Sequence, residues 1–207
     1  MSTLSTFKKL LLDMVPVFLA VFLAYQVNEY RDYRKEKQNL ADAIKNIRFE
    51  MVSNKMQADT CAYYHRDMLY RMDTIRRQQE GENPKEYKSF MHLLQTFSPK
   101  KRNLVLPQLS DISYEAAKRK HAISSMDYET INKISSVYVN IEEGLKSTQK
   151  VLLNSISDPD VMILEDFDRT FILLYGSIQE LYSQEKYLSK QIGFTLEHLE
   201  KAFPEEK

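Results

Sequence analysis

The longest uninterrupted pattern in this sequence is a heptad repeat over residues 40–75. Its steps alternate between four and three residues without a slip, and no proline occurs between Pro16 and Pro84. Apolar residues at this spacing form one stripe along a helix, which must be buried against other helices. The pattern therefore predicts one long helix that ends near Gln79, before Gly81. The seam positions are Leu40, Ile44, Ile47, Met51, Asn54, Ala58, Cys61, His65, Met68, Met72 and Ile75.

Two further heptad runs follow in the second half of the chain. The first begins after Ser124 and Ser125, either of which could cap a helix, and ends before a turn at 158–160. The second ends before Pro204. Three such helices joined by turns predict an all-α fold, an antiparallel coiled-coil-like bundle of three long helices with short inserted helices. The two seams are Ile131, Ile134, Tyr138, Ile141, Leu145, Thr148, Leu152, and Phe167, Phe171, Leu174, Ile178, Leu181, Glu185, Leu188, Ile192, Thr195, Leu199.

Residues 82–123 form a less regular insert between the first two runs. We expect a short helix over 86–97 and a second one over 110–120, which Ser110 or Asp111 would cap. The apolar face of the first short helix would consist of Tyr87, Phe90, Met91 and Leu94.

Residues 10–27 read LLLDMVPVFLAVFLAYQV, an apolar run about as long as a bilayer core requires. We predict an uncleaved transmembrane helix that continues directly into the bundle. A cleaved signal peptide is the alternative, but no Ala-x-Ala-like cleavage site follows the run. The predicted organisation is a tail at 1–9, a transmembrane helix at 10–28, a bundle at 29–203 and a tail at 204–207.

The flanking charges bear on the orientation of this inner (plasma) membrane anchor. Lys8 and Lys9 precede the run, and a basic cluster from Arg31 to Lys37 follows it. The positive-inside rule alone places the bundle in the cytoplasm, but long domains can translocate regardless of flanking charge. The side of the membrane on which the bundle lies is left open by these rules.

Two stretches resemble the DUF6090-like family of small bacterial single-pass membrane proteins, which is frequent in Bacteroidota. Residues 22–31, FLAYQVNEYR, are similar to the end of the membrane helix in that family. Residues 109–117, LSDISYEAA, with Met-Asp-Tyr at 126–128, resemble its mid-chain segment. Tyr30 and Tyr114 stand where the family carries tryptophan. The resemblance implies a membrane anchor with a helical domain and brings no known activity or binding residues.

The composition limits the chemistry that this chain could perform. Its 29 basic residues equal its 29 acidic ones, without the basic excess of most nucleic-acid binders. Only four glycines occur, and none forms a phosphate-binding loop. Cys61 is the only cysteine, and no His-Glu-x-x-His or Glu-x-x-His motif could build a metal site. We expect a non-enzymatic protein with no cofactor, metal, nucleic-acid partner or identified small-molecule substrate.

Four polar and aromatic residues of the insert and the second run lie where two helices are expected to meet: Tyr114, Glu115, Asp127 and Tyr128. We interpret them as a hydrogen-bonded corner, because buried tyrosines need partners, with a ligand or partner groove as the alternative. Asp127 also suits the first turn of a helix. His65 on the first seam is expected to be a buried polar group that sets register, with a functional role as the alternative.

Two further candidates concern the membrane. Asp13 lies inside the apolar run, where an ionisable group is a functional candidate, although it could simply reach the interface. Lys100, Lys101 and Arg102 form a basic loop that could contact lipid headgroups or a partner, or be only solvated.

The leading functional hypothesis is a membrane-anchored interaction or scaffold protein that pairs with a second copy or another membrane or envelope protein. The polar seam residues Asn54, His65, Glu185 and Thr195 are expected to leave part of the seam exposed for such pairing. One alternative is a membrane-linked sensory or signalling module. Another is a subunit of an ion-driven complex in which Asp13 titrates.

Overall fold

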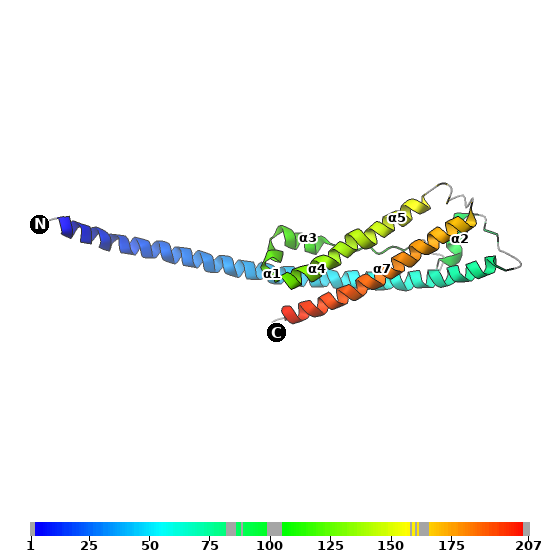
Figure 1. Ribbon diagram of the computed structural model, residues 1–207. Helices are drawn as coiled ribbons and strands as arrows, with labels where there is room; N and C mark the ends of the chain where they lie inside the picture. The colour runs from blue at the N-terminus through cyan, green and yellow to red at the C-terminus, as the bar shows by residue number, and fades with distance from the viewer. Residues whose placement is uncertain are drawn as a thin grey trace.

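Figure 1 shows a helical bundle from which one long helix projects. In the described part of the chain every regular element is a helix, so the all-α prediction is confirmed. The computed structural model describes residues 3–81, 86–87, 89–98, 105–157, 159, 161 and 166–204, with side chains from Met14 onward. The basic loop of Lys100, Lys101 and Arg102 lies outside these residues, as does the side chain of Asp13.

Helix α1 spans Thr3–Gln79 without a break, and it ends where the heptad pattern predicts. Arg76 and Arg77 lie in its last turn, where cations interact favourably with the helix dipole. Every predicted seam position from Ile44 to Ile75 is buried, and Leu40 is half-buried. The alternating step of four and three residues therefore identified the buried face of α1 correctly.

Helix α2 spans Phe90–Phe97, four residues shorter at its start than predicted. Ser89 is its N-cap, and the Ser89 hydroxyl accepts a hydrogen bond from the backbone N–H of His92 at 3.3 Å. Met91, which we predicted on the buried face, is 41% exposed. The helix instead buries a stripe at the spacing of one α-helical face, which consists of Phe90, Leu93, Leu94 and Phe97.

The insert carries the chain back along α1 after α2. The backbone N–H of Gln108 donates to the side chain of Gln57 at 3.0 Å. The Asn54 side-chain amide bonds both the carbonyl and the N–H of Ser110, at 2.7 and 2.9 Å. The chain therefore returns to the middle of α1 before it enters helix α3 (Ile112–Arg119) and the 3₁₀-helix η2 (Ala122–Ser125).

The second heptad run forms one continuous rod with a π-helical middle. Its N-cap is Asp127, whose carboxylate accepts the N–H of Thr130 at 2.9 Å. The predicted caps Ser124 and Ser125 are wrong, because both belong to η2. The segments of the rod are α4 (Tyr128–Val139), η3 (Asn140–Lys146) and α5 (Ser147–Ile156).

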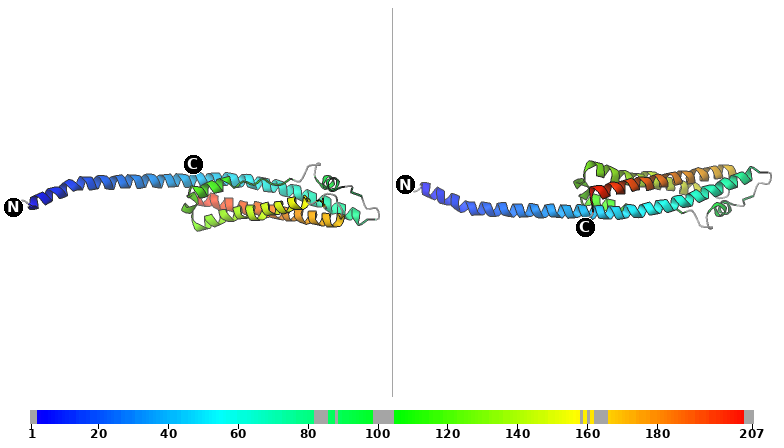
Figure 2. Two further views of the ribbon diagram at one scale, coloured as in Figure 1. Left: turned by 90° about the horizontal axis from the view of Figure 1, so that it is seen from above. Right: turned by 90° about the horizontal axis from the view of Figure 1, so that it is seen from below.

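Helix α7 (Phe167–Ala202) returns antiparallel to α1 and to the α4–η3–α5 rod (Figures 1 and 2). Contacts further along α1 reach earlier residues of α7: Arg48 contacts Leu199, and His65 contacts Glu185. The predicted antiparallel packing does not hold for the other pair, because α1 and the rod run in the same direction. The cause is the returning insert, which places the start of α4 beside the middle of α1 rather than beside its end.

The polar seam residues are all inside the bundle. Asn54, His65, Glu185 and Thr195 are each no more than 3% exposed, so the expectation that they leave the seam open is wrong. Each finds a hydrogen-bond partner that makes burial tolerable. The Thr195 hydroxyl, for example, donates to the carbonyl of Gln191 at 3.0 Å.

The first part of α1 stands clear of the bundle (Figure 2). From Met14 to Gln38 every side chain is exposed. Within the described part of the chain, no helix has the combination of length and apolarity that a membrane crossing needs. The predicted transmembrane segment, 10–28, begins among residues whose side chains lie outside that part.

Candidate functional site

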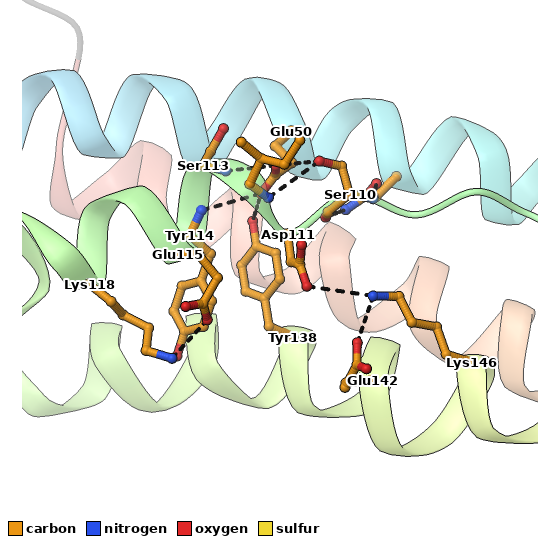
Figure 3. A network of polar contacts seen from close by, with 12 residues as sticks. Glu50, Ser110, Asp111, Ser113, Tyr114, Glu115, Lys118, Tyr138, Glu142 and Lys146 are labelled. Carbon is orange, nitrogen blue, oxygen red and sulfur yellow. Dashed lines mark hydrogen bonds and ion pairs between the residues drawn. The ribbon is translucent and has the colours of Figure 1, made fainter.

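Glu50 is a buried carboxylate at the point where α1, α3 and α4 meet (Figure 3). Its Oε2 accepts hydrogen bonds from the Ser110 hydroxyl at 2.7 Å and the Ser113 N–H at 2.9 Å. Its Oε1 accepts from the Tyr138 hydroxyl at 2.7 Å and the Tyr114 N–H at 3.4 Å. Four donors from three segments therefore converge on one side chain of α1.

This carboxylate caps helix α3 from outside. Asp111, one of the two predicted caps, makes no side-chain cap bond. The other, Ser110, directs its hydroxyl to Glu50 and accepts only a long bond, 3.4 Å, from the N–H of Ile112. The first-turn N–H groups of a helix favour a negative charge, and Glu50 supplies it. Sequence reasoning missed Glu50, since its partners are 60 or more residues away.

Two stacked tyrosines complete the junction. The rings of Tyr114 and Tyr138 lie 4.2 Å apart and nearly parallel, and the Tyr114 hydroxyl bonds the Ser135 hydroxyl at 3.0 Å. Burial and the hydrogen bond to Glu50 raise the pKa of Tyr138, which keeps its hydroxyl a donor. Beside them, Lys146 contacts Asp111 on the outer side of the junction (Figure 3).

The structure does not bring the four predicted corner residues together. Tyr114 belongs to the Glu50 junction, whereas Glu115 forms a surface ion pair with Lys118 at 2.8 Å. Asp127 caps α4, and Tyr128 beside it is 79% exposed. Only Tyr114 of the four takes part in a buried network.

His65 and Glu185 form a second buried polar contact, between α1 and α7. His65 Nδ1 lies 2.9 Å from Glu185 Oε2, and both side chains are fully buried. Their other polar atoms, His65 Nε2 and Glu185 Oε1, have no hydrogen-bond partner in the described part of the protein. Burial raises the pKa of Glu185, and the bond to His65 opposes this shift. Burial and the nearby Glu185 raise the pKa of the Cys61 thiol to about 12.

His198 links α7 to the start of α4, which its isolated place in the sequence did not indicate. The Lys133 ammonium donates to His198 Nδ1 at 3.0 Å, so the ring proton lies on Nε2 and is donated to Thr130 Oγ1 at 2.9 Å. The Thr130 hydroxyl in turn donates to the Asp127 carboxylate at 2.6 Å. This chain of contacts ties the α4 cap to α7.

At the other end of the interface, Arg48 of α1 holds the C-terminus of α7. Its guanidinium donates to the carbonyls of Leu199 and Phe203. Next to it lies an open groove of about 960 Å³, where α1 leaves the bundle. Its charged and aromatic lining consists of Tyr30, Tyr33, Arg34, Lys37, Lys45, Arg48 and Phe203.

The buried junctions are suited to holding helices in register. Helix packing encloses both carboxylates, and each is bonded to groups of this chain. Among the residues that the structure describes, no group of three or more His, Cys, Asp or Glu side chains could hold a metal ion. The groove, the projecting part of α1 and an exposed face of α1 within the bundle are open to partners.

Comparison with known proteins gives no match to a family model, to a curated protein or to a solved structure. The resemblance to the DUF6090-like family therefore stays a prediction.

Proposed function

We propose that this protein is a membrane-anchored, non-enzymatic scaffold, in which residues 10–28 of α1 cross the inner membrane and the bundle serves as a rigid interaction domain. One observation carries the proposal: α1 exposes apolar side chains on all its faces before it reaches the bundle.

The exposed apolar run covers Met14 to Val27. Phe18 is 76% exposed, Val21 65% and Leu23 60%, and these positions point in different directions around the helix. Soluble proteins rarely expose a continuous apolar surface of this kind. A helix that is apolar all round belongs either in a large core or in a bilayer, and no part of the bundle covers this one.

The length of the predicted segment agrees with a bilayer. At 1.5 Å per residue, residues 10–28 span roughly 28 Å, close to the thickness of the hydrocarbon layer. Tyr30 and Tyr33 follow directly, where tyrosines are favoured at the membrane interface. Because α1 is continuous, the anchor would hold the bundle in a fixed orientation.

The interaction part of the proposal rests on a second surface of α1. Phe49, Met56, Tyr63 and Tyr70 repeat at intervals of seven residues and are 66–79% exposed. A heptad repeat of large side chains on an exposed helix face is suited to pairing with another helix.

Alkaline carbonate extraction of membranes from cells that express the full chain tests the anchor. We expect the wild-type protein to stay in the membrane pellet, and a Val21→Arg/Leu23→Arg variant to be released, because charge near a bilayer centre is costly. The matched control is Phe49→Arg/Tyr63→Arg, which changes positions of the same helix that are at least as exposed and should stay in the pellet. Release of the wild-type protein would contradict the proposal.

The side of the membrane can be read with a membrane-impermeant thiol reagent. Ser136 of α4 is exposed, whereas Cys61 is buried, so Ser136→Cys gives a single reactive thiol. Labelling in intact cells would place the bundle outside the cytoplasm. Labelling only after lysis would place it inside, as the flanking charges favour.

A further inference from the structure

The groove beside the projecting helix has an uneven charge distribution. It is lined by four basic residues and, among the residues described, by no acidic one. At 100° per residue, the acidic side chains of α1 between 29 and 48 fall outside the groove face. The groove face carries Arg34, Lys37, Lys45 and Arg48, and the other faces carry Glu29, Asp32, Glu36 and Asp42.

Three of the four cations are free to bind an anion. Arg48 is engaged with the end of α7. Arg34, Lys37 and Lys45, in contrast, are exposed and form no ion pair or hydrogen bond with any group that the structure describes. Tyr30 and Tyr33 line the same groove.

Height along α1 separates the two ends of the groove. Counted from Val27, the last residue of the apolar run, Arg34 lies about 11 Å and Lys37 about 15 Å further along the axis. Their long side chains can reach back to a headgroup layer that extends roughly 5–8 Å beyond the hydrocarbon. Lys45 lies about 27 Å from Val27 along the axis, which is about three times the roughly 8–10 Å over which salt screens charge.

We propose that the membrane-proximal end of this groove, formed by Arg34, Lys37, Tyr30 and Tyr33, binds the phosphate headgroups of anionic phospholipids in the bilayer that holds α1. The inference rests on the proposed membrane anchorage. The expected occupant is lipid, because two of the three unpaired cations, Arg34 and Lys37, lie where headgroup phosphates would surround the helix. A soluble acidic partner would instead use the whole length of the groove, Lys45 included.

The test is a titration of the full chain in detergent micelles with phosphatidylglycerol or phosphatidylcholine, with bound lipids counted by native mass spectrometry. We expect the wild-type protein to prefer phosphatidylglycerol. Arg34→Gln/Lys37→Gln should bind it about 30-fold more weakly, the factor for two cations close to headgroups. Both positions are exposed and glutamine is a good helix former, so the variant should fold.

The matched control removes the same charge elsewhere. Lys35→Gln/Lys45→Gln changes one cation at headgroup height outside the groove and one in the groove far from the membrane. We expect its affinity for phosphatidylglycerol to change less than threefold. That limit corresponds to roughly half of the binding free energy that one cation close to the headgroups contributes. An equal loss in both double variants would show general charge attraction and overturn the site, as would equal wild-type affinity for the two lipids.

The carbonate extraction separates the two proposals. A wild-type protein that stays in the pellet but binds both lipids equally overturns only the lipid site. A wild-type protein that carbonate releases overturns the anchorage, and the lipid site falls with it.

Discussion

Nδ1 of His65 and Oε2 of Glu185 lie 2.9 Å apart in the middle of the α1–α7 interface, where solvent reaches neither side chain. The two residues are 120 positions apart in the sequence. A slip of α7 along α1 by one heptad would place each polar group against apolar side chains, at a large desolvation cost. The pair therefore specifies the register of the interface.

Breaking this pair should be costly and replacing it should not. His65→Leu leaves the Glu185 carboxylate buried without its partner, so we expect the free energy of unfolding to fall by about 3–5 kcal/mol. His65→Leu/Glu185→Leu should recover most of that loss, because two apolar side chains need no partner. Urea unfolding of the full chain in micelles, followed by circular dichroism, measures both. The prediction is contradicted if the double variant loses as much free energy of unfolding as His65→Leu and Glu185→Leu lose together.

Stability should also depend on pH through Glu185. Because burial raises the pKa of Glu185, the folded protein keeps this proton at pH values where the unfolded chain has released it. The contribution of Glu185 to the free energy of unfolding is therefore largest at low pH and declines as pH rises above 4.5, its ordinary value. Between pH 4.5 and 7, the free energy of unfolding should decline more steeply with pH in the wild-type protein than in Glu185→Gln. The exposed substitution Glu200→Gln is the control and should leave the decline unchanged.

The Glu50 junction allows a comparison of two stacked tyrosines. Tyr138→Phe removes a hydroxyl that donates to a carboxylate, and we expect a loss of about 1.5–3 kcal/mol in unfolding free energy. Tyr114→Phe removes a hydroxyl bonded to a neutral serine, and its loss should be about 0.5–1.5 kcal/mol. Chemical unfolding of both variants measures the difference. Equal losses would show that the bond from Tyr138 to the Glu50 carboxylate is no stronger than the bond between the Tyr114 and Ser135 hydroxyls.

Arg48 should control the last turn of α7. Arg48→Gln shortens the side chain that satisfies the Leu199 and Phe203 carbonyls, so the turn should open more often. We expect the amide of Phe203, which donates to Leu199, to exchange its hydrogen roughly tenfold faster, as a loss of about 1.4 kcal/mol would give. Lys45→Gln, one turn earlier, should leave this exchange rate unchanged.

The Cys61 thiol should be inert while the protein is folded. With a pKa of about 12, roughly one molecule in ten thousand carries the thiolate at pH 8. Burial also blocks access to the sulfur. A maleimide should therefore label Cys61 only in urea, and an engineered Ser136→Cys thiol should react in the folded protein. Rapid labelling of folded wild-type protein would contradict the buried position.

The heptad spacing was sufficient to predict which faces of α1, α4–α5 and α7 are buried, because a seam position depends only on helical period. It could not predict the direction of the rod, which depends on the path of residues 105–111 back along α1. Glu50 escaped prediction for a related reason. It lies one residue before Met51 on the seam, and local capping rules do not see a carboxylate 60 residues away.

The pairing of the first and last helices also sets the order of events during synthesis. Glu185 leaves the ribosome 120 residues after His65, an interval of about 6–24 s at ordinary rates of translation. Throughout that time the apolar stripe of α1 has no α7 to cover it. During that interval the uncovered stripe is the surface through which two nascent chains could aggregate, and the arrival of α7 removes it.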